Sequence, residues 1–324
     1  MSPKHSLLII CSFAAITISG GPPSARPVSL QEKQPPTLRV ESNLVLVEAT
    51  VKGKSGNMID GLTADDFILK DDGLPQTIAY CGRDQLPLAV ALVVDVSESI
   101  VPYFDQLSDS MSTALPKMKP DDQVSLFTFS NIVEKRAELS TDKATVAERM
   151  AGLRVGGSTN LNDALYESAR YLGERATAMR RVIILVSDNT PSQEGKHSPK
   201  EVETEILKAD AAVYSLKIPG ENSPQVQKYI DQAQGRLVKV ATIVPHTGGE
   251  IFDVSKEGTL ALAFDAILQR LKARYTLGYA PIGHPVQDGR AHSIEVLLAP
   301  GRCKDCRVET KRGYIATLPP GAKK

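Results

Sequence analysis

Seven consecutive apolar residues at 88–94, LAVALVV, constrain the fold of this chain more than any other feature. A strand with one face in water alternates apolar and polar residues, whereas a strand covered on both faces is apolar throughout. Strands of the second kind occur in parallel sheets that helices cover on both sides. The segment therefore predicts a central strand of an α/β fold.

Helix and strand patterns alternate over residues 86–274. Apolar residues at helical spacing predict helices around 104–118, 161–172 and 260–271, and apolar stretches predict strands at 124–129, 182–186, 211–218 and 249–254. This alternation predicts a doubly wound, mostly parallel sheet, whose ligands bind beyond the carboxyl ends of the strands. Between the last two strands, residues 219–247 fit either an ordinary helix and loop or an inserted element that shapes a binding surface.

Short strands and turns flank this region on both sides. They are predicted at 37–51, 65–70 and 76–80 before it, and at 275–279, 292–298 and 307–315 after it. Each set alone has too few strands to bury a core, so we expect the two sets to pair into one small β-sandwich-like domain. The predicted organisation is a β domain built from residues 38–85 and 275–318, an α/β domain inserted at 86–274, and a tail at 319–324.

The first residues predict export. Lys4 and His5 precede an apolar run at 7–18, and small residues follow it, which is the pattern of a signal peptide over residues 1–25. The alternative is a membrane anchor, but twelve residues are fewer than the roughly 20 that a membrane span needs. Proline-rich residues 26–37 predict a disordered spacer. We therefore expect a secreted or periplasmic protein with no membrane span after leader cleavage.

Charge and aromatic content exclude some classes of partner. The chain has 38 Lys and Arg residues and 38 Asp and Glu residues, and the basic residues are scattered. Nucleic-acid binding needs a concentrated positive surface, so nucleic acid is not the expected partner. Aromatic residues are 5% of the chain and Trp is absent, so surfaces that stack on sugars or bases are poorly supplied.

Oxygen-bearing side chains follow the predicted strands of the sheet. Asp95, Ser97 and Ser99 form a D-x-S-x-S sequence directly after the central strand, Thr159 lies in the loop before the second predicted helix, and Asp188 follows the strand at 182–186. Each residue alone fits a helix cap or a turn. Because positions 1, 3 and 5 of such a turn can direct their oxygens to one point, the set predicts a site for a hard divalent cation.

The segments LVVDVSES, GGSTNLNDAL and VIILVSD, in this order, resemble the von Willebrand factor A (VWA) domain with its metal-ion-dependent adhesion site, or MIDAS. The resemblance implies a Rossmann-like α/β fold that holds Mg²⁺ or Mn²⁺, with one coordination position left for an Asp or Glu of a partner protein. The ligands that it implies are Asp95, Ser97, Ser99, Thr159 and Asp188. One departure is Asn189, where many VWA domains have Gly; since Asn tolerates a positive φ, we expect the loop to survive.

The flanking segments extend the resemblance. The stretch from LRVESNLVLVEATV to DDGLPQTI before the α/β region, and YTLGYAP and RVETKRGY after it, are similar to the VWFA-related family of secreted bacterial proteins found notably in Acidobacteria. The similarity then covers nearly the whole chain after the leader.

The expected function is that of a secreted, non-enzymatic adhesion or protein-binding module. An alternative is a structural scaffold of an envelope or secretion assembly whose metal site is stabilising or vestigial. A third candidate is a Mg²⁺-dependent phosphoryl-transfer enzyme with Asp95 as nucleophile, but such enzymes usually carry a second Asp where this chain has Ser97. No catalytic residue is predicted, and the scattered histidines are expected to be separate surface or turn residues.

Three cysteines remain after leader removal, and exported proteins meet an oxidising environment. Cys303 and Cys306 can form a local hairpin disulfide, or Cys81 can pair with either of them across the β domain. Zinc binding by these cysteines is poorly supported because no second C-x-x-C is present.

Overall fold

The computed structural model describes residues 44–83, 86–150, 153–220, 223–233 and 235–317. The predicted leader (1–25), spacer (26–37) and tail (319–324) lie outside these residues. Within the described part of the chain, no helix combines the length and the apolar character that crossing a bilayer requires.

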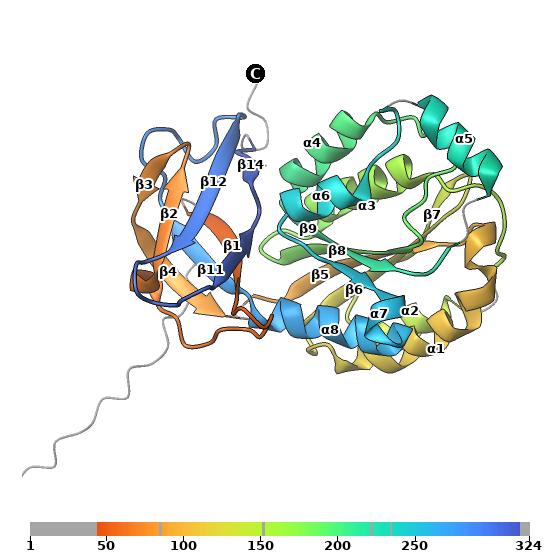
Figure 1. Cartoon of the computed structure of the whole chain (residues 1–324), viewed down its shortest axis with the longest axis horizontal. Coiled ribbons are helices and arrows are strands. Elements are labelled where there is room, and N and C mark those ends of the chain that lie inside the picture. Colours follow the sequence, from red (N-terminus) through yellow and green to blue (C-terminus); the bar gives the residue numbers. More distant parts are fainter. Residues whose placement is uncertain (1–43, 84–85, 151–152, 221–222, 234, 318–324) are drawn as a thin grey trace, which may run out of the picture. The chain divides into compact units, whose positions relative to one another are not determined.

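A mostly parallel sheet of six strands forms the centre of the α/β region (Figure 1), and the sequence predicts five of these strands. Its order is β10 (Ile251–Asp253), β9 (Ala211–Lys217), β8 (Arg180–Ser187), β5 (Leu88–Asp95), β6 (Gln123–Phe129) and β7 (Val133–Ser140). Neighbouring strands are parallel except for β7, which runs antiparallel to β6 at the edge. The sequence analysis missed β7 because most of its side chains are exposed or half-buried and charged, so it carries little apolar signal.

Helices cover both faces of this sheet (Figure 1). One face packs on α1 (Phe104–Ala114), α2 (Lys143–Glu148), α7 (Val254–Glu257) and α8 (Leu260–Ala273), and the other on α3 (Leu161–Arg175), α4 (Pro199–Ala209) and α6 (Val240–His246). The position of β5 between the two layers of helices explains why its sequence is apolar throughout. Val90, Leu92 and Val94 belong to the first core, whereas Ala91 and Val93 belong to the second.

The segments that follow β8 and β9 hold more helices than the sequence predicts. Residues 219–247 hold both α5 (Pro224–Ala233) and α6, rather than one helix and a loop. The helix α4 was not predicted, although Ser198 and Glu201 form a reciprocal capping box and Pro199 occupies the first turn. That combination is a start signal for a helix and could have located α4 from the sequence.

The terminal segments form two four-stranded sheets, and each sheet combines strands from both ends of the chain. One sheet has the order β13 (Arg307–Thr310), β1 (Val45–Lys52), β11 (Tyr275–Tyr279), β4 (Ile78–Arg83); the other has β14 (Gly313–Ile315), β12 (Ala291–Leu298), β2 (Phe67–Asp71), β3 (Leu74–Gln76). Val47, Leu69, Leu277 and Val296 lie in one core that both sheets share. This confirms that the α/β fold is inserted in a sandwich of terminal strands.

The predicted strand at 307–315 is wrong in one respect, because the chain there forms two strands. β13 pairs with β1, and β14 pairs with β12 in the other sheet. Between them, Lys311 donates from Nζ to the Leu46 carbonyl at 3.1 Å and to Asp210 at 2.6 Å. The polar Lys311–Arg312 pair therefore marks the point where the chain changes sheets.

Short 3₁₀ turns complete the structure: η1 (Ala64–Asp66), η2 (Glu98–Tyr103) and η3 (Leu115–Lys117). The turn η2 matters for the site because it begins inside the D-x-S-x-S sequence.

Candidate metal centre

The three loops that carry the predicted ligands meet at one edge of the central sheet. Asp95 is the last residue of β5, and Ser97 and Ser99 follow it at the start of η2. Asp188 directly follows β8, which is the parallel neighbour of β5. Thr159 lies two residues before α3. Parallel strands that are paired in register end at the same edge, so the fold brings the loops together.

The predicted ligands surround a single cleft of about 260 Å³. Ser97, Ser99, Thr159 and Asp188 line it, together with Glu98, Gly157, Thr190, Ser192, Ser223 and Val226. Asp95 has no solvent exposure and accepts a hydrogen bond at Oδ1 from the Ser97 N–H at 2.8 Å. The structure thus brings all five residues to one place, four on the cleft and Asp95 hydrogen-bonded to its wall.

The hydroxyl groups of the cleft do not act as helix caps. Ser97 occupies the N-cap position of η2, but its side chain makes no capping hydrogen bond. The N-cap of α3 is Asn160, whose side-chain oxygen accepts from the Asp163 N–H, and not Thr159. The Ser97 and Ser99 hydroxyl oxygens are 3.3 Å apart. Helix capping therefore does not explain the hydroxyl residues at positions 97 and 159.

Two carboxylates near each other, one of them fully buried, give the cleft its electrostatic character. Burial raises the pKa of Asp95 to about 6, hydrogen bonds from Ser97 and Ser187 oppose that rise, and the charge of Asp188 adds to it. A bound divalent cation would compensate both charges. Carboxylate and hydroxyl oxygens are donors that Mg²⁺ and Mn²⁺ accept, so the residues present fit these ions.

Supporting contacts hold the ligand loops in place. The Ser187 hydroxyl donates to Asp95 Oδ2 at 2.7 Å, and the Thr159 N–H donates to the Ser192 hydroxyl at 2.8 Å. A Cβ on Gly220 would lie 2.4 Å from Asp188 Oδ2, so only glycine permits this approach without displacing the carboxylate. The sequence analysis assigned no role to Ser187, Ser192 or Gly220, because residue spacing alone does not show that these positions contact the predicted ligands.

Asn189 has the backbone conformation that the sequence indicates. Asn189 has a φ of 64°, which confirms the positive φ expected after the third-loop Asp. Its side chain donates from Nδ2 to the Ser215 hydroxyl at 2.8 Å, a contact that glycine could not make. Glu98 is exposed at the border of the cleft.

The structure chooses between the two disulfide pairings that the sequence allows. A disulfide joins Cys303 and Cys306, and Cys81 is a free thiol whose pKa burial raises to about 11.

The expectation that the histidines are separate surface residues is wrong for three of them. His197 stacks on Tyr166, and His284 and His292 stack on each other. Tertiary folding creates these contacts, so residue spacing does not reveal them.

Comparison with known proteins adds a family. The family model of the von Willebrand factor type A domain matches residues 90–191, which include all five predicted ligands. No curated protein sequence matches the chain at a significant level.

The solved structures with similar folds have low identity to this chain. An aerotolerance-related membrane protein from Bacteroides fragilis is 14% identical at a TM-score of 0.43, and the match covers 57% of this chain and 98% of that one. BatB from Bacteroides thetaiotaomicron is 10% identical at a TM-score of 0.40, and the match covers 56% of this chain and 99% of that one. Proximal thread matrix protein 1 from the mussel byssus, solved with a zinc-occupied MIDAS motif, is 17% identical at a TM-score of 0.44. The match covers 61% of this chain and 48% of that one. Residues 90–191 therefore match the von Willebrand factor type A family, and the sheet topology of the α/β region that contains them is that of a von Willebrand factor A-like fold.

Proposed function

We propose that this protein is an exported, metal-dependent protein-binding module whose cleft holds Mg²⁺ or Mn²⁺ and receives an Asp or Glu of a partner protein. The observation that carries the proposal is the cleft itself, where three hydroxyl residues and Asp188 line one opening and Asp95 lies buried behind Ser97. VWA domains are often metal-dependent, and this chain retains an oxygen ligand at every position that the motif needs.

Each residue has a distinct role in this proposal. Asp95 and Asp188 provide two negative charges that match a divalent cation. Ser97, Ser99 and Thr159 provide neutral hydroxyl ligands, which leave the cation electrophilic enough to attract a further carboxylate. When bound, the cation supplies an open coordination position for the partner's acidic side chain. Hydrogen bonds from the Ser97 N–H and the Ser187 hydroxyl fix the Asp95 carboxylate.

A binding role accounts for the environment of Asp95 better than phosphoryl transfer. A nucleophilic carboxylate must reach a phosphorus atom with a free oxygen. Asp95 has no solvent exposure, and its two oxygens accept hydrogen bonds from Ser97 and Ser187. We therefore propose that the protein does not act as an enzyme at this cleft.

A thermal-shift titration with Mg²⁺ and Mn²⁺ tests the cation site. We expect the melting temperature of the wild type to rise, since a ligand at 100 times its Kd stabilises the native state by about 2.7 kcal/mol, and a chelator to reverse the rise. Asp95→Ala should abolish the response. The matched control is Glu98→Gln, which removes an exposed carboxylate next to two ligands and should respond as the wild type does.

Partner capture separates the adhesion function from the scaffold alternative. If the cation completes the binding surface, capture of a partner from the envelope fraction will need Mg²⁺ or Mn²⁺ and will fail for Asp95→Ala. Capture that chelator leaves unchanged would favour a scaffold in which the cation only stabilises the loops. The absence of any thermal response up to millimolar cation would contradict the cation site itself.

A further inference from the structure

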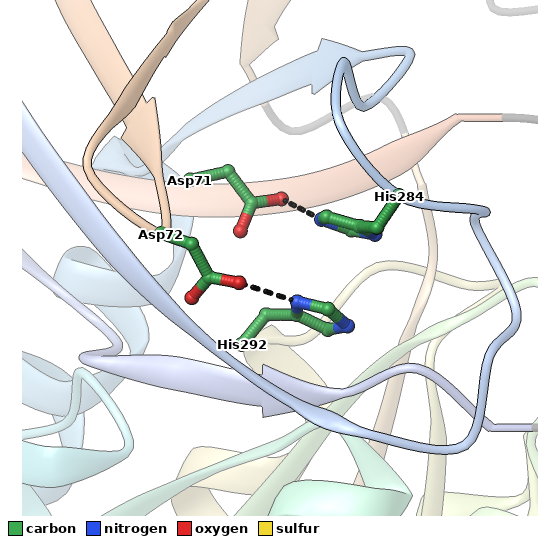
Figure 2. Close-up of side chains that lie close together, drawn as sticks. All are labelled: Asp71, Asp72, His284 and His292. Atoms are coloured by element: carbon green, nitrogen blue, oxygen red, sulfur yellow. Dashed lines mark hydrogen bonds and ion pairs between the residues drawn. The ribbon is translucent and has the colours of Figure 1, made fainter.

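Two aspartates and two histidines meet in the terminal sheets, in a cluster that shares no residue with the MIDAS cleft (Figure 2). Asp71 ends β2, Asp72 follows it in the turn to β3, His292 lies on β12, and His284 lies in the loop before that strand. One nitrogen or oxygen atom from each residue lies within 4.8 Å of the others. Figure 2 shows both carboxylates directed at the two rings.

Each histidine presents one ring nitrogen to an aspartate of this cluster. His284 Nε2 is 3.0 Å from Asp71 Oδ2, and His292 Nδ1 is 2.8 Å from Asp72 Oδ2. The two rings stack with their centroids 3.7 Å apart. Two ring nitrogens and two carboxylates therefore lie close together.

The outer nitrogen of each ring has its own acceptor. His284 Nδ1 lies 2.9 Å from the Pro285 carbonyl, and His292 Nε2 lies 3.1 Å from Asp288 Oδ1. Histidines that bind metals nearly always donate their second N–H to a carbonyl or a carboxylate, which fixes the tautomer and leaves the inner nitrogen free to coordinate. Both histidines of the cluster have such an acceptor at the outer nitrogen, whereas the inner nitrogen donates to an aspartate and would have to release its proton for a metal to bind.

Asp71 has a buried oxygen that the described structure leaves without a hydrogen-bond partner. The residue is 1% exposed, and its Oδ2 accepts from the hydroxyls of Tyr279 at 2.6 Å and Tyr314 at 3.0 Å, but no described group donates to Oδ1. A buried carboxylate oxygen without a partner is costly. A cation between the aspartates and the histidines would satisfy it.

The backbone holds Asp72 in place before any ligand binds. Asp72 has a φ of 48°, and Gly73 after it has a φ of 79°, so the turn depends on two left-handed residues. The Asp72 N–H donates to the Ser293 carbonyl at 2.9 Å, and Asp72 Oδ1 accepts from the Ser293 N–H at 2.8 Å. These contacts tie the turn to β12 and leave Asp72 Oδ2 directed at His292.

We propose that Asp71, Asp72, His284 and His292 form a second metal site that binds Zn²⁺. Imidazole nitrogens and carboxylate oxygens are donors that zinc accepts in proteins, and four of them match its usual four-fold coordination, whereas Mg²⁺ prefers oxygen alone. Zinc bonds of about 2.0–2.1 Å place ligand atoms roughly 3.4 Å apart, so on binding the two His–Asp pairs would move apart, the wider separations would shorten and the rings would leave their stack. The two carboxylates balance the charge of the ion.

The site would bind two separate parts of the terminal sheets to each other. Asp71 at the end of β2 and Asp72 in the turn to β3 supply the carboxylates, while His292 on β12 and His284 in the loop between β11 and β12 supply the imidazoles. Since four protein ligands leave no open position, the role is structural and not catalytic. Zinc would therefore stabilise the sandwich and leave the chemistry of the MIDAS cleft unchanged.

Zinc titration in an Asp95→Ala background tests the proposal, because that substitution removes the MIDAS cleft as a competing site. We expect the full-length, chelator-treated Asp95→Ala protein to bind one equivalent of Zn²⁺ by calorimetry and to gain melting temperature. Adding His284→Gln and His292→Gln should weaken binding at least 100-fold. His246→Gln is the matched control, since His246 lies outside the cluster, and it should bind one equivalent.

A single substitution distinguishes loss of zinc binding from loss of folding in the double variant. His284 lies in a loop, so His284→Gln should keep the far-ultraviolet circular dichroism spectrum of its parent and lose zinc affinity at least tenfold. The proposal is overturned if the Asp95→Ala protein binds no zinc, or if zinc binds His284→Gln and the double histidine variant as it binds the parent. Failure of the MIDAS response alone, with one zinc equivalent retained, leaves this site standing.

Discussion

Asp95 combines a functional position with an unfavourable environment. Its side chain is fully buried, yet its function in the proposed site requires it to be charged. Hydrogen bonds from Ser97 and Ser187 stabilise the charge only in part, and the neighbouring Asp188 opposes it. Without a cation this buried charge lowers the stability of the fold, and in the proposed site a bound cation would compensate it.

We predict that Asp95→Asn separates stability from function. An asparagine oxygen can still accept from the Ser97 N–H, while the buried charge is removed. The metal-free protein should therefore gain roughly 1–3 kcal/mol of unfolding free energy, and the stabilisation by Mg²⁺ should vanish. Urea unfolding in chelator and in excess Mg²⁺ measures both effects. Lower stability of Asp95→Asn in chelator would contradict this account, and Glu98→Gln should change stability by less than about 0.5 kcal/mol.

Among the elements, α3 connects the metal cleft to the body of the domain. Its N-cap Asn160 accepts from the Asp163 N–H and donates to the Asp163 carboxylate at 2.9 Å. Thr159, immediately before it, is held separately through the Ser192 hydroxyl. The helix start and the proposed ligand are therefore adjacent in sequence but fixed by different contacts.

This separation predicts that Asn160→Ala affects stability and not cation binding. Loss of the cap should lower the unfolding free energy by about 1 kcal/mol. The Mg²⁺-dependent rise in melting temperature should persist, because Ser192 still positions Thr159. Parallel thermal titrations of Asn160→Ala and Thr159→Ala provide the comparison, with the response lost only in the second. An equal loss in both would mean that the cap also orients the ligand.

Prediction of elements from the sequence succeeded where burial is continuous and failed where it is not. The strands β5 and β8 are buried along their length, so their apolar runs identify them. The edge strand β7 exposes charged residues and depends on pairing with β6, a contact that local composition does not encode. The prediction of a single strand at 307–315 failed for a similar reason. β13 and β14 are separate strands because they pair with partners in different sheets.

At the scale of the whole molecule, one buried ion cluster links strands of the terminal sheets to the α/β region. Glu48 on β1 pairs with Arg274 at the end of α8, with 3.0 Å between Oε2 and Nη1, and also with Arg180 on β8. Both arginines are buried, and each also donates to a backbone carbonyl, of Gly248 and Leu271 respectively. Removal of the Glu48 carboxylate would take one ion-pair partner away from each of two buried arginines.

We predict that Glu48→Gln lowers the unfolding free energy by roughly 2–3 kcal/mol at pH 7. Burial alone would raise the pKa of Glu48, but Arg180 and Arg274 outweigh it and hold that pKa below its usual 4.5. A lowered folded-state pKa gives stability that is present above about pH 4.5 and is lost as the pH falls through the folded value.

The difference between wild type and Glu48→Gln should therefore be constant from pH 7 to about pH 5 and shrink on further acidification. Chemical unfolding from pH 7 to pH 3 measures this difference. A gap that persists undiminished at pH 3 would show that packing, and not charge, is responsible. Glu295→Gln serves as the control, because its pair with Lys70 is largely exposed and should contribute little at any pH.

The sequence by itself determined the features that depend on local spacing. Burial on both faces requires an apolar run at 88–94, and the loop ligands Asp95, Ser97 and Ser99 stand at alternate positions of one turn. Only the tertiary structure decided which distant residues meet. His284 lies 213 positions from Asp71, and His292 lies 220 positions from Asp72. The pairing of β2 with β12 brings them together, and strand pairing across the chain depends on the global fold, which no local pattern reveals.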